Sequence, residues 1–564
     1  MLKPVIALRY WHTLRHLKPI QFYARIQFQL FGLYGLKSRI RNPPPEVRSI
    51  GLGWQCPVSQ EASLLGPRLF RLLNKKYELS TRGGWNASSL EKLWLYNLHY
   101  FGDLTAKNAV TRITWHQDLI VDWIASNPSS IGNGWEPYPT SLRMVNWVKW
   151  SLAGRVLLTF QLPEGFIQSL ATQTRWLMKR LEWHLLGNHL FANAKALVFA
   201  GVYFQGEEAE NWLKQGLEII AHELDEQILK DGGNFERSPM YHAIFLEDLL
   251  DLINLSKTYP GLVDAKLENH WLEVVRKMLE WLQWMSHPDG QIALFNDAAF
   301  GVAPTITDLQ AYAQRLEIGI VENDNFDSQA SHHIAIKHLK DSGYIRLASK
   351  KAIALLDVAP VGPDYLPGHA HADTLSFELS IFGQRVIVNG GTSCYGLSPK
   401  RLRERQTVSH STVEIDGESS SEVWGGFRVA RRAYPFDLAV SSDSSQVIVS
   451  CSHDGYRRLP GKPVHRRTWG FKEGTIEVQD VIFGSYSQAI ARFIVHPDVA
   501  ISEVGKGVWQ LKLAHGEFIT FVIDSGVGHL ENAFYAPEFG RVLETKCLAV
   551  NLHNASSSIQ LRWN

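Results

Sequence analysis

The sequence has little cysteine, no long hydrophobic run and no excess of charge of one sign. Four widely spaced cysteines without a CxxC pair exclude a disulfide scaffold and a cysteine-rich zinc site. No run reaches the roughly 18 consecutive apolar residues of a membrane-spanning helix, so we expect no transmembrane segment. The 57 Lys and Arg residues balance 56 Asp and Glu residues. A net charge of +1 gives no overall field to attract nucleic acid, and we expect none to bind.

Residues 1–50 carry Lys and Arg throughout and lack the apolar core and cleavage site of a signal peptide. Apolar and aromatic residues at Ile6, Tyr10, Leu14 and Leu17 predict a basic amphipathic helix. Two interpretations stay open for this segment. The helix could pack on the main body, or it could contact a membrane surface or an assembly partner.

Two kinds of periodicity divide the rest of the chain. From about 90 to 320 apolar residues recur every three or four positions, as at Trp271, Val275 and Met278, which predicts helices joined by short loops, and we assign 51–325 to this helical domain. Of the 19 tryptophans, 15 lie at or before Trp284, so the two parts are expected to be built differently. From 326 to 564 the period becomes two and indicates antiparallel strands. Strands are predicted at 446–451, 474–483, 507–513 and 517–523.

The segment 187–193, GNHLFAN, begins a new apolar helical stripe. Asn188 is a good helix N-cap, and this structural role alone would explain it. The functional alternative is that Asn188 and His189 line a cleft at a helix N-terminus. An amide N–H and the helix dipole would hold a carboxylate there.

The segment 234–242, NFERSPMYH, contains a second helix start, because Ser238 and Pro239 match an N-cap followed by proline. Tyr241 then falls in the first helical turn. It could be an ordinary aromatic of a capped helix, or a phenol poised as acid or base beside positive charge. Glu236 and Arg237 precede it and are candidates for substrate contacts.

The segment 135–143, WEPYPTSLR, is predicted as a rigid loop because of its two prolines. Sugar rings stack on aromatic side chains such as Trp135 and Tyr138. Arg143 could hold a carboxylate through two parallel hydrogen bonds. Core packing explains the same residues equally well.

The strand-rich half has its densest group of titratable residues at 368–373, GHAHAD. On a strand, His369 and His371 would point to the same face. Two imidazoles on one face could form half of a metal site, or could simply be hydrogen-bonded histidines. His410 is a candidate third ligand.

Four segments together resemble the heparinase II/III family of polysaccharide lyases. They are, in chain order, GNHLFANAKAL, ERSPMYH, GHAHADTLSFELSIFGQRVIVNGGTSCYG and SHSTVEIDGESSSEVWGGFRVARRA. The resemblance covers the chain from about residue 90 to its end. It implies an α+β multidomain fold, with an N-terminal (α/α) toroid of helical hairpins and a C-terminal antiparallel β-sandwich.

The resemblance also implies β-elimination on a uronic-acid polysaccharide. This chemistry needs a neutralised uronate carboxylate, a base for the C5 proton and an acid for the departing O4. At the positions that match the family's motifs, the resemblance implies that Asn188 would neutralise the carboxylate, with His189 beside it. Tyr241 and His369 would share the acid and base roles, in an order that the stereochemistry at C5 decides.

Several relatives hold a structural zinc, and the resemblance makes His371 one ligand. The chain has Asn389 where the family often has aspartate, and neutral Asn is a poorer zinc ligand than a carboxylate. No organic cofactor is implied. The resemblance favours the cell envelope or periplasm, but no signal peptide is recognisable, so a cytoplasmic or membrane-peripheral location stays open. The missing leader and the basic first helix favour processing of a bacterium's own capsule or exopolysaccharide.

Two other functions stay open. A glycoside hydrolase on an (α/α) toroid would need two facing carboxylates, for which Glu236, Asp289 and Asp297 are candidates. A non-catalytic polysaccharide-binding or assembly protein would need none of the acid or base groups.

Overall fold

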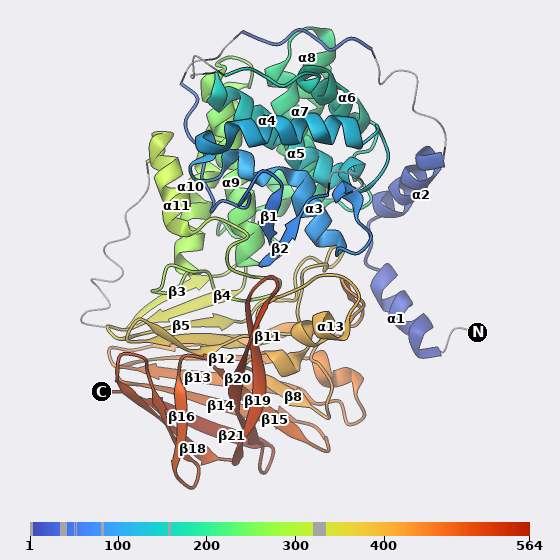
Figure 1. Ribbon diagram of the computed structural model, residues 1–564. Coiled ribbons are helices and arrows are strands. Elements are labelled where there is room, and N and C mark those ends of the chain that lie inside the picture. The colour runs from blue at the N-terminus through green and yellow to red at the C-terminus, as the bar shows by residue number, and fades with distance from the viewer. Residues whose placement is uncertain are drawn as a thin grey trace.

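The computed structural model describes residues 4–33, 42–49, 51, 53–80, 84–155, 160–319 and 334–564. A helical domain is stacked on a domain of antiparallel sheets, as Figure 1 shows. The last helix of the first domain, α11, spans Ile306–Arg315, and the first strand of the second, β3, spans Ala335–Leu339. The predicted boundary at 325/326 lies outside the described residues. Within the described ranges, no helix is both long and apolar enough to cross a bilayer.

The helical domain is built in two layers. Successive helices α5, α7 and α9 contact one another, and α6, α8 and α10 pack behind them. The helix bounds are α3 Lys92–Tyr100, α4 Ile113–Ser126, α5 Pro137–Gly154, α6 Phe166–Met178, α7 Gly187–Tyr203, α8 Glu207–Gln227, α9 Pro239–Thr258 and α10 Ala265–Trp284. Helix α7 is apolar on nearly every side because it is enclosed by its neighbours, whereas α8 has one apolar stripe and a charged outer face. This alternation of inner and outer helices forms the predicted toroid.

The second domain is a sandwich of two antiparallel sheets. One sheet has the order β11-β12-β13-β14-β21-β18-β17-β16, with bounds Pro435–Ser442, Gln446–His453, Val464–Lys472, Thr475–Phe483, Ser556–Arg562, Phe518–Ser525, Val508–Lys512 and Ala500–Gly505. The other has the order β19-β20-β15-β7-β6-β5-β4-β3, and β8 (Val413–Ile415) also pairs with β15. Its remaining bounds are Val527–Glu538, Arg541–Asn551, Ala489–Val495, Gln384–Val388, Phe377–Ile381, Ala352–Asp357 and Tyr344–Ala348. Alternate residues such as Phe377, Trp469 and Phe521 meet between the sheets and form the core.

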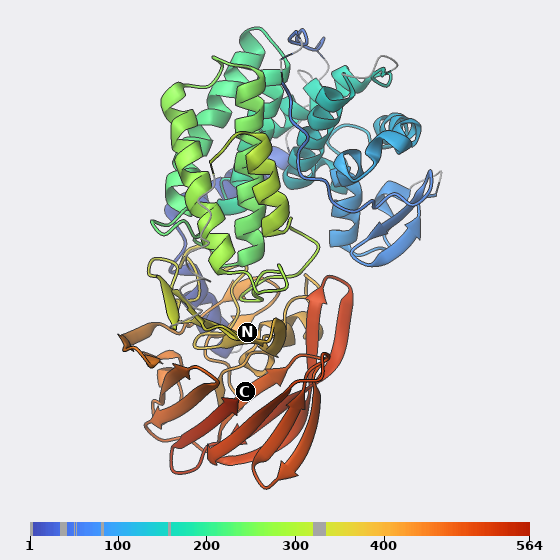
Figure 2. The same cartoon turned by 90° about the vertical axis from the view of Figure 1, so that its left-hand side faces the viewer.

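Smaller elements complete the chain. Helices α1 (Pro4–Leu14) and α2 (Pro19–Leu33) run along the outside of both domains, and the hairpin of β1 (Leu69–Leu72) and β2 (Lys75–Glu78) lies beside α3. Helix α13 (Pro399–Arg405) and the ribbon of β9 (Val423–Trp424) and β10 (Arg428–Val429) lie on the sandwich side of the junction. The view in Figure 2 shows the loops that follow the helices meeting the upper strands of the sandwich.

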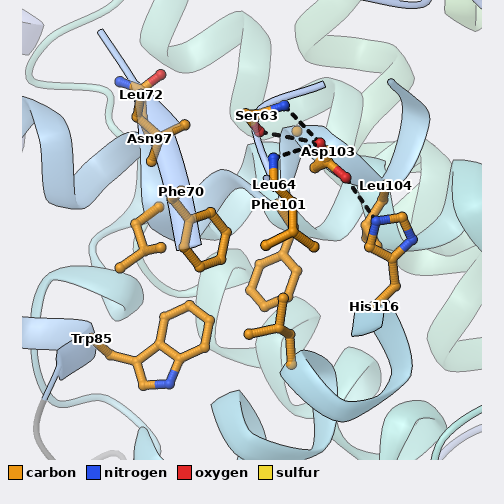
Figure 3. Close-up of a pocket in the computed structure, with 13 residues that line it drawn as sticks. Ser63, Leu64, Phe70, Leu72, Trp85, Asn97, Phe101, Asp103, Leu104 and His116 are labelled. Carbon is orange, nitrogen blue, oxygen red and sulfur yellow. Dashed lines mark hydrogen bonds and ion pairs between the residues drawn. The ribbon is translucent and has the colours of Figure 1, made fainter. Parts of the chain in front are cut away.

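A small pocket at the edge of the toroid is lined partly by segment 63–72, which includes strand β1 (Figure 3). Asp103 accepts hydrogen bonds from the backbone N–H groups of Ser63 and Leu64 at 2.7 and 2.9 Å. Burial opposes ionisation, but hydrogen bonds from His116 and Arg112 lower the pKa of Asp103 to about 2. The residues that line this pocket include none of the predicted site residues. The Asp103 hydrogen bonds attach segment 63–72 to the toroid, and the candidate active site lies elsewhere.

Candidate active site

The first part of the site is the start of helix α7. Leu186 and Gly187 both have positive φ, 61° and 54°, and turn the chain sharply into the helix. A Cβ on Gly187 would lie 2.4 Å from Leu366 Cδ2, so any other residue would have to displace this side chain and adopt a strained positive φ. The helix begins at Gly187, which places Asn188 in the first turn rather than at the cap. Its half-buried side chain is therefore available at a helix N-terminus.

His189 lies on the ring of Tyr138, with 4.5 Å between ring centroids. Its Nδ1 is 3.2 Å from Glu182 Oε1. Burial opposes protonation, but the fields of Glu182 and Glu236 raise the pKa of His189 above its ordinary value. Protonation of His189 is therefore easier than for a free imidazole, and the protonated ring would add positive charge beside Asn188.

The second part of the site is the start of helix α9, which forms as the sequence predicts. Ser238 caps the helix and accepts a hydrogen bond from the Tyr241 backbone N–H at 3.2 Å, and Pro239 follows it. The Tyr241 hydroxyl lies 2.9 Å from the hydroxyl of Tyr395. Burial, together with the neighbouring phenol, raises the pKa of Tyr241 well above its ordinary value. The phenol is therefore neutral and carries a proton that it could donate.

The third part comes from the sandwich. The ring of His369 lies on the ring of Tyr241, with 3.9 Å between centroids. His369 Nδ1 is 2.9 Å from Asp297 Oδ2, and this contact orients the imidazole with Nε2 toward the toroid. His369 Nε2 is 3.7 Å from Glu236 Oε2. The structure thus brings a toroid phenol and a sandwich imidazole together.

Asp297 holds the His369 imidazole in position through its Nδ1. It lies in the loop between α10 and α11 and forms a bidentate pair with Arg401 of α13. It also contacts His371 Nε2 at 2.9 Å. Burial opposes ionisation, but the Arg401 charge and the two histidine contacts hold the pKa of Asp297 well below its ordinary value. Asp297 is therefore a permanent buried anion that positions His369.

Glu236 is the unusual group of the site. Only 3% of the residue is exposed, and its carboxylate lies at the start of α7, where the Asn188 backbone N–H favours the ionised form. Burial raises the pKa of Glu236, against the opposing fields of His369 and His189. The neutral acid is consequently favoured over a wider pH range than for a solvated glutamate.

The structure corrects two of the expected substrate contacts. The predicted loop at 135–143 is largely helix α5, and both Trp135 (4% exposed) and Arg143 (0% exposed) lie in the toroid core. Trp135 packs on Trp123 and Trp176. The Arg143 guanidinium lies over the Trp123 ring and donates hydrogen bonds inside the domain, and burial lowers its pKa. Neither side chain can reach a polymer.

Arg237 also has a different role from the expected one. Its Nε donates to the Ser342 carbonyl at 2.9 Å, and its Nη1 donates to the Phe235 carbonyl. Ser342 belongs to the turn between β3 and β4, so Arg237 joins the toroid to the sandwich. Of the predicted contacts around the site, Tyr138 and Glu236 remain next to the catalytic candidates.

Three residues of the site were missed or given another role by sequence reasoning. Asp297 was only a candidate hydrolase acid, and Tyr395 and Arg401 were not singled out. Tyr395 lies inside the long segment 368–396 that carries the resemblance, which was a usable signal. Arg401 lies in an arginine-rich stretch without any pattern that pairs it with Asp297.

The residues of the expected zinc site lie together and are hydrogen-bonded within the protein. His371 Nδ1 faces His410 Nε2 at 3.2 Å, and His371 Nε2 is taken by Asp297. The Asn389 side-chain oxygen accepts from the Ser411 N–H, and its amide donates to Ser376. Across the described parts of the chain, no three His, Cys, Asp or Glu side chains gather as metal ligands would. We therefore derive no catalytic step through a metal.

Family models match both domains. Residues 107–316 match the model described as Heparinase II/III N-terminus, and residues 333–564 match Heparinase II/III-like, C-terminal. The chain belongs to the heparinase II/III family. A heparin-sulfate lyase of Bacteroides stercoris is 25% identical over 254 residues, which cover 42% of this chain and 38% of that protein. A heparin-sulfate lyase of Pedobacter heparinus is 25% identical over 253 residues, covering 41% and 36%. The matched part spans less than two-fifths of these curated relatives.

Solved structures of the family share the fold. The crystal structure of heparinase III superposes with a TM-score of 0.70 at 18% identity, covering 86% of this chain and 80% of that one. Heparan sulfate lyase HepC from Pedobacter heparinus gives 0.55 at 17% identity, covering 96% and 87%. The toroid and sandwich of this heparinase II/III family chain therefore have the same arrangement as in these lyases.

Proposed function

We propose that this protein is a polysaccharide lyase that cleaves uronic-acid-containing polymer by β-elimination. The observation that carries the proposal is the stacking of Tyr241 from the toroid on His369 from the sandwich, next to the α7 N-terminus. The family membership and the names of the curated relatives support it.

The geometry suggests a division of roles. The Asn188 amide, the α7 N-terminus and His189 would bind the uronate carboxylate and stabilise the charge that develops at C5. His369 would act as base through Nε2, because Asp297 holds its Nδ1. The C5 proton would pass to His369, and the C5–H electron pair would form the C4=C5 double bond. The C4–O4 bond would break as Tyr241 gives its proton to O4.

Glu236 makes the binding of a carboxylate dependent on protonation. An ionised Glu236 would repel a uronate, whereas the neutral acid could donate a hydrogen bond to it. Burial already favours the neutral form. We therefore expect productive binding when Glu236 is protonated.

The test is turnover of a panel of heparan sulfate, alginate, chondroitin and bacterial exopolysaccharides, followed by the ultraviolet absorbance of the unsaturated product. Tyr241→Phe and His369→Ala should each lower the rate by ~10²–10⁴-fold, as expected for acid and base groups. Tyr434→Phe and His515→Ala, at exposed positions, are matched controls and should keep the rate. New reducing ends without unsaturation would indicate a glycoside hydrolase instead. Retained biological activity in both site variants would indicate a non-catalytic binding or assembly protein.

Two of the three candidate hydrolase carboxylates are paired with arginines. Asp297 is bound by Arg401, and Asp289 is bound by Arg385. Glu236 is thus the one remaining candidate of the three, and hydrolysis requires two.

We further propose that the substrate is a capsule or exopolysaccharide of the producing bacterium, processed at the cell envelope. The exposed basic helices α1 and α2 support this placement. Fractionation of the native host tests it, and recovery of the enzyme only in the culture medium would refute it.

A further inference from the structure

Helices α1 and α2 lie on the outside of the molecule, where they bridge the two domains (Figure 1). Helix α1 touches the sandwich, because Trp424 Nε1 donates to Thr13 Oγ1 and Arg9 pairs with Glu422. Helix α2 touches the toroid, because Arg180 donates to the Phe28 carbonyl and lies over its ring. Both helices are thus attached to the body at defined points.

These two helices expose many large apolar side chains. The sides that face the body carry polar residues such as Thr13 and Gln21 together with apolar ones such as Ala24 and Phe28. The outward sides carry large apolar residues, including Trp11 (65% exposed), Tyr23 (67%) and Ile26 (60%). Further exposed apolar residues on the same two helices are Ile6, Leu8, Leu14, Ile20, Phe22 and Leu30. Exposed apolar side chains in this number on two consecutive helices indicate an interaction site.

The charge of this segment indicates what covers the surface. Residues 1–45 contain eight Lys and Arg residues and no Asp or Glu. Among the described residues, Arg15 and Arg25 are exposed, whereas Arg9 pairs with Glu422 and Lys18 pairs with Glu226 of the body. A second copy would bring two basic faces together, which disfavours self-association. Anionic phospholipid supplies both the opposite charge and an apolar layer, and Trp and Tyr are favoured at such interfaces.

We propose that α1 and α2 bind the surface of an anionic phospholipid membrane, with their outward apolar face inserted at the headgroup level. The inference does not depend on the lyase activity. It has a consequence for the site, because Gln21 donates to the Tyr365 carbonyl and Lys18 lies over the Tyr365 ring. The next residue, Leu366, contacts Gly187 at the start of α7. Membrane binding would thus place the candidate active site close to the bilayer.

The experiment is sedimentation of the full chain with vesicles of phosphatidylcholine alone, or with about one-third phosphatidylglycerol. Wild type should bind the anionic vesicles at least about tenfold more tightly than the neutral ones, and high salt should weaken the binding. The variant Trp11→Glu/Tyr23→Glu/Ile26→Glu should lose at least about tenfold in affinity. Its soluble-polymer activity and thermal midpoint should stay unchanged, since all three side chains are exposed.

A charge-matched control separates lipid insertion from general electrostatics. Val504→Glu/Phe518→Glu/Val527→Glu adds the same three charges at exposed apolar positions of the sandwich, and it should bind vesicles like wild type. Equal loss of binding in both triple variants would refute the proposal. The proposal would also be refuted if wild-type protein did not bind anionic vesicles. It would be refuted as well if wild-type protein formed a dimer in solution and only the helix variant were monomeric. An inactive enzyme that still binds vesicles would refute the lyase function and leave this inference standing.

Discussion

Replacing Asp297 with asparagine is the sharpest test of how the site is held together. Asp297 contacts His369 Nδ1 and His371 Nε2 and pairs with Arg401, and its side chain is fully buried. An aspartate accepts hydrogen bonds only, so it holds the proton on His369 Nδ1 and leaves Nε2 free as a base. An asparagine can present its amide N–H to Nδ1 instead and favour the opposite tautomer.

The expected magnitudes follow from these contacts. A mispositioned or mis-protonated base removes most of a general-base contribution, so kcat of Asp297→Asn should fall by ~10²–10⁴-fold. KM should change little, because Asp297 has no exposed surface with which to contact polymer. Arg401 loses its buried counter-charge, which costs roughly 3–5 kcal/mol of unfolding free energy.

The assay measures kcat, KM and denaturant unfolding on the same protein preparation. The matched control is Asp289→Asn, since Asp289 also pairs with an arginine, Arg385, at the domain junction but is 36% exposed. The control should lose little stability and keep its kcat. If folded Asp297→Asn keeps kcat within about threefold of wild type, Asp297 does not position His369 and the reasoning fails.

Three further outcomes are expected. Because burial raises the pKa of Glu236, the acid becomes ionised only as pH rises through that raised value. Wild-type KM for a uronan should then rise with pH, and Glu236→Gln should abolish the rise while keeping kcat within about tenfold. Arg143→Met should lower the unfolding free energy by ~1–3 kcal/mol, because the His99 carbonyl and the Gln173 side chain lose a buried donor, and the KM of the folded enzyme should not change. Isothermal titration should detect zinc binding in Asn389→Asp but not in wild type, because a carboxylate there would supply the missing anionic ligand; zinc binding by wild type would contradict this.

Local chemistry made some elements predictable from the sequence. The strand predicted at 474–483 is β14, Thr475–Phe483, because its alternating side chains fill the space between two sheets. The helix start at Ser238 and Pro239 is set by the cap hydrogen bond and the proline, both of which are local. The toroid and the order of its motifs came from the family resemblance rather than from periodicity alone.

Other features depend on packing that local pattern does not encode. The local sequence around Trp135 and Arg143 is the same whether these side chains face a sugar or the core. The packing of helix α5 against its neighbours decides which of the two they face. Asp297 and Arg401 are 104 residues apart, and their pairing exists only after the two domains meet. His369 and Tyr241 were identified because short motifs surround them. Asp297 and Arg401, which hold His369 in position, lie in segments without a motif.

The two domains meet through the same loop that positions the imidazole. The Asp297 backbone N–H donates to the His369 carbonyl, and the His371 N–H donates to the Asn296 side chain. The Ser238 hydroxyl, at the start of the helix that carries Tyr241, donates to the Asp297 carbonyl. The distance between phenol and imidazole is therefore set by hydrogen bonds to one short loop, and not by the broad contact of two domain surfaces. Acid and base groups contribute only when they are held within a few tenths of an ångström of the reacting atoms. A loop bonded to both elements provides that constraint, so a mutation that loosens residues 296–297 should cost activity before it separates the domains.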